Sequence, residues 1–107
     1  MDERFLQQLK KGVLPLCILF AIRREARYGY EIMGEVRAVF PDVYDGSIYT
    51  VLRRLAADGY ASTELRDEPS GGPTRKYYAI TPAGAAYLEQ LRRSWHEMQE
   101  RLNRLGV

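Results

Sequence analysis

The stretch "DGSIYTVLRRLAADGY", residues 45–60, predicts a helix with one apolar face and one cationic face. The apolar residues that recur at helical spacing are Ile48, Val51, Leu52 and Leu55. Such a stripe is typical of a helix that packs one side against a core. Asp45 or Ser47 can cap the start of this helix, and Gly59 can supply the left-handed residue after its end.

The remaining side chains of this helix cannot all lie on the apolar stripe, so several of them face solvent. They are Ser47, Tyr49, Thr50, Arg53 and Arg54. Hydroxyl groups near a helix N-terminus suit phosphate oxygens and base edges, and arginine can make bidentate contacts with phosphate or guanine. The two arginines can equally be ordinary solvated cations, and Tyr49 can equally be a core or interface residue.

Three helices are expected before this stretch. Residues 2–11 form a short amphipathic helix that ends at Gly12, and residues 13–26 form a buried helix with Pro15 in its first turn. Residues 27–40 follow with a third apolar stripe. Its members are Ile32, Val36 and either Val39 or Phe40.

After Gly59 the apolar period changes from that of a helix to that of strands. The segments 60–68 and 74–80 are rich in β-branched and aromatic residues, and "PSGGP" between them is a turn signal. Tyr77 and Tyr78 should therefore point to opposite faces of a hairpin. Thr81 then caps a last helix that runs to about Leu105.

This order predicts a mainly α protein with a small antiparallel β-hairpin, a winged helix-turn-helix. In such a fold the third helix of the compact bundle enters the major groove, and the hairpin, or wing, leans on the adjacent backbone. Arg75 and Lys76 follow the glycine-rich tip of the wing and are candidate phosphate contacts. We expect residues 1–82 to form the DNA-binding part with its N-terminal helix, and residues 83–107 to form a dimerisation helix, in one compact domain overall.

Composition allows this function without arguing for it. The chain has 107 residues and a formal net charge of +2, and residues 45–80 hold five cations and five anions. DNA binding must therefore come from the placement of the cations. Cys17 is the single cysteine, which excludes an internal disulfide and suggests a small buried apolar residue in a cytoplasmic protein. We expect no cofactor, metal site, catalytic constellation or membrane segment.

The last helix carries a regular apolar seam. Its residues, spaced 3, 4, 3, 4 and 3 apart, are Leu88, Leu91, Trp95, Met98, Leu102 and Leu105. This heptad pattern predicts a homodimer, in which the seam meets the same helix or the N-terminal helix of a second copy, with Phe5 and Leu9. Trp95 and Met98 either fill this interface or line an apolar slot for a planar aromatic effector.

Several motifs together resemble the PadR family of transcriptional regulators. They are "YGYEI" at 28–32, "GSIYTVLRRLAADGY" at 46–60, "GGPTRKYYAITPAG" at 71–84 and the last helix with its tryptophan. The resemblance implies a winged-helix dimer, usually a repressor, with a recognition helix that begins at Ser47. It also implies that Tyr30 packs close to the DNA side and that Gly72 lies near the backbone. The family usually has Pro where Thr50 stands and Glu where Ala56 stands.

The function we expect is therefore sequence-specific binding of a double-stranded DNA operator, with Ser47, Tyr49 and Thr50 near the bases. A winged-helix module that binds another protein is one alternative, because the charges are balanced. An aromatic-ligand sensor without DNA binding is the other.

Overall fold

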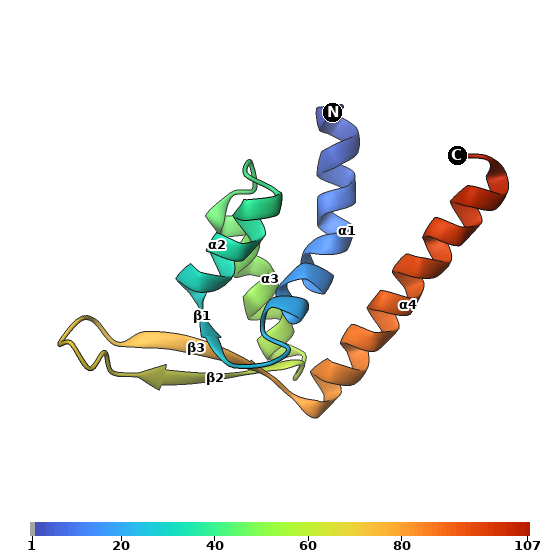
Figure 1. Ribbon diagram of the computed structural model, residues 1–107. Helices are drawn as coiled ribbons and strands as arrows, with labels where there is room; N and C mark the ends of the chain where they lie inside the picture. Colours follow the sequence, from blue (N-terminus) through green and yellow to red (C-terminus); the bar gives the residue numbers. More distant parts are fainter. Residues whose placement is uncertain (1) are drawn as a thin grey trace.

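The computed structural model describes residues 2–107, which form four helices and three strands. In chain order these are α1 (Glu3–Ala21), β1 (Arg27–Tyr28), α2 (Gly29–Val39), α3 (Asp45–Ala57), β2 (Ala61–Arg66), β3 (Arg75–Ile80) and α4 (Pro82–Leu105). Figure 1 shows α1, α2 and α3 grouped above the sheet, with α4 leaving the sheet and standing apart from α2 and α3. The expected winged-helix fold is confirmed.

One apolar cluster joins the helices to the sheet. Its fully buried side chains are Ile18, Leu19, Ile22, Ile32, Ile48 and Leu52. They come from α1, from the turn that follows it, and from α2 and α3, so the stripes seen in the sequence converge on one core. Tyr78 of β3 and Leu88 of α4 belong to the same cluster.

The prediction of two N-terminal helices separated at Gly12 is wrong, because α1 is continuous through Gly12 and Pro15. A helical glycine costs only about 1 kcal/mol relative to alanine. Burial of Leu14 and Ile18 on the same helix outweighs that cost. Pro15 lies in the helix interior and offers no N–H to the preceding turn, and Figure 1 shows α1 bending along its length. Among the described residues, no helix is both long and apolar enough to cross a bilayer.

The wing belongs to a three-stranded antiparallel sheet with the order β1-β3-β2. We expected only the hairpin of β2 and β3, whose register pairs Ala61 with Ile80 and Arg66 with Arg75. The additional strand, β1, is two residues long and pairs Tyr28 with Tyr77. A strand of two residues is too short to show an alternating pattern in the sequence. It is recognised as a strand only because it pairs with β3.

The start of α4 is held against the end of the wing by specific contacts. As predicted, Thr81 caps the helix: its hydroxyl accepts from the N–H of Gly84 at 3.0 Å and donates to the carbonyl of Gly59 at 2.6 Å. The rings of Tyr60 and Tyr87 stack with centroids 4.3 Å apart. These contacts set the direction in which α4 leaves the sheet.

Candidate nucleic-acid interface

The side chains of α3 divide into a buried face and a face open to solvent. Ile48, Leu52 and Leu55 are buried, as their spacing predicts, and Val51 packs partly against the same cluster. The exposed side chains of the opposite face are Ser47, Thr50, Arg53 and Arg54. The division into two faces is confirmed, and contact of the exposed face with DNA remains a prediction.

The start of α3 differs from the expected one. Its N-cap is Tyr44, so neither Asp45 nor Ser47 is the capping residue, and the helix begins before Ser47. The carboxylate of Asp45 instead forms an ion pair with Arg37 of α2. The side chain of Asp45 thus joins α3 to α2 and does not cap its own helix.

The two small hydroxyls on the exposed face have different surroundings. Thr50 Oγ1 donates a hydrogen bond of 2.8 Å to the carbonyl of Gly46, one turn earlier in α3. Its oxygen can still accept a hydrogen bond. Within residues 2–107 the Ser47 hydroxyl has no hydrogen-bond partner, so it is available both as donor and as acceptor.

Tyr49 is half-buried and lies at the contact of α2 with α3. A Cβ atom added at Gly29 would come within 3.0 Å of Cε1 and 3.1 Å of the hydroxyl of this tyrosine. Gly29 therefore allows the ring of Tyr49 to lie close to the first turn of α2. The sequence left open whether Tyr49 faces DNA or packs in the core or an interface. In the structure its ring packs partly against the core.

Burial raises the pKa of Tyr78 on β3, and the neighbouring Tyr49 raises it further, while Arg53 acts in the opposite direction. The phenol of Tyr78 thus stays protonated at neutral pH. Tyr49 packs against the apolar cluster that contains Tyr78, so α3 and β3 pack on one core.

The two cations of β3 that we expected to contact phosphate have unequal surroundings. Arg75 forms an ion pair of 2.7 Å with Glu68, and its guanidinium lies 4.5 Å from the ring centroid of Tyr28. Lys76 is exposed and has no ion-pair partner among the residues described. A Cβ atom added at Gly72, at the wing tip, would lie 3.2 Å from the side chain of Glu68. Arg75 is therefore partly neutralised within the wing, which the sequence did not indicate, whereas Lys76 is free.

An arginine and tyrosine stack on the outer face of the sheet was missed by the sequence analysis. Tyr30, which is 72% exposed, stacks on Tyr28 with ring centroids 6.3 Å apart, and Tyr28 contacts Tyr77 at 5.6 Å. Arg66 covers the ring of Tyr77 at 4.3 Å. Arg75 and Tyr77 alternate along β3, which places them on one face of the sheet and could have indicated this stack. Their partner Tyr28, however, lies on β1, a strand that the sequence pattern does not predict.

Exposed apolar side chains lie on α4 and on the N-terminal part of α1. They are Phe5, Leu9, Trp95, Met98, Leu102 and Leu105. Leu88, which we expected at a dimer interface, is only 4% exposed and belongs to the chain's own core. Leu91 is partly buried against that core. The first turns of α4 lie over the core, so the seam that is open to a partner begins at Trp95.

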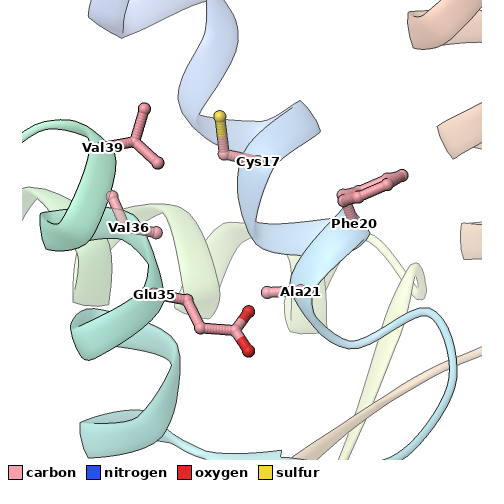
Figure 2. Close-up of a pocket in the computed structure, with 6 residues that line it drawn as sticks. All are labelled: Cys17, Phe20, Ala21, Glu35, Val36 and Val39. Atoms are coloured by element: carbon pink, nitrogen blue, oxygen red, sulfur yellow. The ribbon is translucent and has the colours of Figure 1, made fainter.

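A small pocket of about 190 Å³ lies between α1 and α2. Figure 2 shows it lined by Cys17 and Phe20 from α1 and by Glu35 and Val39 from α2. Cys17 is half-buried here, and this burial raises the pKa of its thiol. The thiol is therefore protonated at neutral pH and behaves as the small apolar residue expected from the sequence.

The chain is similar to known regulators in sequence and in structure. The model of the Transcriptional regulator PadR-like family matches residues 18–90. The transcriptional regulator Rv3488 of Mycobacterium tuberculosis is 30% identical over 93 residues, which cover 87% of this chain and 85% of that protein.

Solved structures agree with this match. A PadR-like transcriptional regulator from Bacillus cereus is 38% identical, with a TM-score of 0.80 over 92% of this chain and 95% of its own. A Streptococcus transcriptional regulator is 30% identical, with a TM-score of 0.83 over 94% of this chain and 98% of its own.

Proposed function

The chain belongs to the PadR-like family of transcriptional regulators, and from this premise we propose that it is a repressor that binds a pseudo-palindromic DNA operator as a homodimer. The observation that carries this proposal is the exposed face of α3. There Arg53 and Arg54 lie beside two hydroxyl side chains and make no ion pair within the described part of the chain.

In this proposal the two kinds of side chain on α3 have separate tasks. Arg53 and Arg54 contact phosphates, and Ser47 and Thr50 lie near base edges. Tyr49 supports the helix through its ring and offers DNA only its exposed edge. On the wing, Lys76 contacts phosphate, with Gly72 and Arg75 near the backbone, and Tyr30 extends this surface from the start of α2.

Binding measured as a function of salt tests the phosphate contacts. We expect Arg53→Ala and Arg54→Ala each to weaken binding to all DNA sequences and to lower the salt slope by about 1. Arg24→Ala is the matched control, because Arg24 is an exposed cation outside this surface. Unchanged affinity in both α3 variants would contradict the proposal and favour a module that binds another protein.

The base-reading role needs a different measurement. Selection of bound fragments from genomic DNA, with the unaltered protein and with Ser47→Ala and Thr50→Ala, compares sequence preferences. We expect these variants to relax the preference at particular positions while keeping most of the non-specific affinity. The same preference in all three proteins would remove these two residues from base reading.

A planar aromatic effector is a second candidate feature of the function. Trp95 and Met98 lie one turn apart on α4, and both are exposed in the single chain. In a dimer two such pairs can form the walls of an apolar slot. We expect a planar aromatic dye to quench Trp95 fluorescence, and Trp95→Ala to lose dye binding while operator affinity stays largely intact. Retained dye affinity in that variant would leave Trp95 as interface packing alone.

A further inference from the structure

A groove of about 880 Å³ lies between the N-terminal half of α1 and the exposed face of α3. One wall carries Lys10 and Lys11 of α1, and the other carries Arg53 and Arg54 of α3. The groove is large enough for a small ligand or for part of a nucleic-acid backbone. It extends the exposed face of α3 toward α1.

One cation of the groove is already neutralised. Lys10 Nζ lies 2.6 Å from Asp42 Oδ2, and the lysine side chain is 10% exposed. This pair joins α1 to the turn that precedes α3, so it holds the two walls together. After this pair is set aside, the described residues of the lining include one further anion, Glu3, and three cations, Lys11, Arg53 and Arg54.

Three cations of the groove differ from several arginines of the helical bundle and the wing in having no carboxylate partner. There Arg27, Arg37, Arg66 and Arg75 all have a carboxylate within salt-bridge distance. Within the described residues Lys11, Arg53 and Arg54 have none. Cations that gather in one groove and are not neutralised there create a site for an anion.

The backbone at the start of α3 adds to this field. The N-cap residue Tyr44 makes no side-chain hydrogen bond to the first turn, and Gly46 of that turn lines the groove. A helix N-terminus without such a cap presents N–H groups and a partial positive charge. This end of α3 therefore reinforces the attraction that the three cations exert.

We propose that the α1–α3 groove binds phosphate groups, with Lys11 of α1 acting together with Arg53 and Arg54 of α3. The phosphates come from one of two sources, the backbone of bound DNA or a free phosphorylated molecule. If the phosphates belong to bound DNA, this inference rests on the proposed function. The free-phosphate source does not depend on it.

The first arm of the test measures DNA binding against salt. With the DNA backbone as the source, Lys11→Ala lowers the salt slope by about 1 and weakens binding to all sequences alike. Lys11→Arg keeps the charge and restores both, whereas Arg24→Ala, the matched control outside the groove, changes neither. The substitution to alanine at an exposed helical position leaves the fold intact, and a circular dichroism spectrum checks this.

The second arm uses inorganic pyrophosphate and no DNA. Amide shifts are followed by NMR during titration, with sodium chloride at equal ionic strength as the reference. With a free phosphate as the source, shifts saturate at Lys11, Gly46 and Arg53, and Lys11→Ala weakens binding at least fivefold. Pyrophosphate then also releases DNA beyond the effect of chloride.

The two arms separate failure of this inference from failure of the proposed function. If the unaltered protein binds DNA but Lys11→Ala matches Arg24→Ala in both arms, the inference is overturned and the proposed function stands. If the unaltered protein binds no DNA, the proposed function fails, and the pyrophosphate titration alone decides the inference.

Discussion

At the scale of single residues, Gly84 and Gly12 show how surroundings decide what a helical glycine does. A Cβ atom at Gly84 would lie 1.9 Å from the carbonyl oxygen of Tyr60, whereas nothing lies within 4 Å of one at Gly12. The first glycine permits α4 to start against the wing. The second has no such role.

We therefore expect the two alanine substitutions to have opposite effects on stability. Gly84→Ala must displace the backbone and should lower the free energy of unfolding by about 1–3 kcal/mol. Gly12→Ala should raise it by about 0.5–1 kcal/mol, because alanine has the higher helix propensity. Urea unfolding followed by circular dichroism measures both. Equal effects of the two substitutions would show that the contact with Tyr60 does not restrict position 84.

The Lys10–Asp42 pair predicts a pH dependence. The hydrogen bond from Lys10 is the main cause that lowers the pKa of Asp42 below its ordinary value of 3.8. A lowered carboxyl pKa adds stability above the ordinary value, and this stability is lost as the pH falls through the folded-state pKa. Asp42→Asn should therefore be less stable than the unaltered protein at pH 7. The difference should shrink below pH 3.8 in urea unfolding, and two parallel stability curves would contradict this account.

At the scale of elements, the wing is braced by contacts that also restrain its cations. Arg75 is held between Glu68 and the ring of Tyr28, while Lys76 is not paired in the part of the chain that the structure describes. Of these two cations of β3, Lys76 can contact a phosphate directly, whereas Arg75 must first leave a carboxylate.

This arrangement predicts that Glu68→Gln strengthens DNA binding, because it removes the carboxylate that competes with phosphate for Arg75. The gain should be several-fold at low salt and should diminish in the Arg75→Ala background, which controls for the general loss of one negative charge. Titration of labelled operator with the single and double variants measures it. An equal gain in both backgrounds would assign the effect to net charge alone.

At the scale of the whole molecule, α4 extends the structure to 55 × 30 × 20 Å and leaves an apolar seam uncovered. In Figure 1 its C-terminal part lies away from the other helices. Trp95, Met98 and Leu102 are exposed there at heptad spacing. Burial of this seam by a second copy is the reason why we propose a homodimer.

Leu102→Glu should therefore shift the protein toward monomer, because it would place a charge in the apolar seam. Asn103→Glu introduces the same charge one residue away, off the seam, and should leave the dimer intact. Sedimentation velocity over a range of concentrations distinguishes the two. A monomeric unaltered protein, or equal behaviour of the two variants, would contradict the proposed dimer.

The sequence by itself determined those features that depend on local patterns. The stripe of Ile48, Leu52 and Leu55 predicted both faces of α3, and the turn signal of residues 69–73 predicted the hairpin. Thr81 predicted the start of α4. Each follows from periodicity or capping within a few residues of the chain, so no knowledge of distant contacts was needed.

Only the tertiary structure decided features that depend on residues distant in the chain. β1 exists because Tyr28 pairs with Tyr77, and α1 passes through Gly12 because burial along the helix outweighs its low propensity. Long-range packing likewise places Leu88 in the core. The same holds for charge: the sequence gives the number of cations, but only the fold shows that Arg75 is paired and that Arg53 has no ion-pair partner among the described residues. An ion pair depends on distance in space, which the order of residues does not specify.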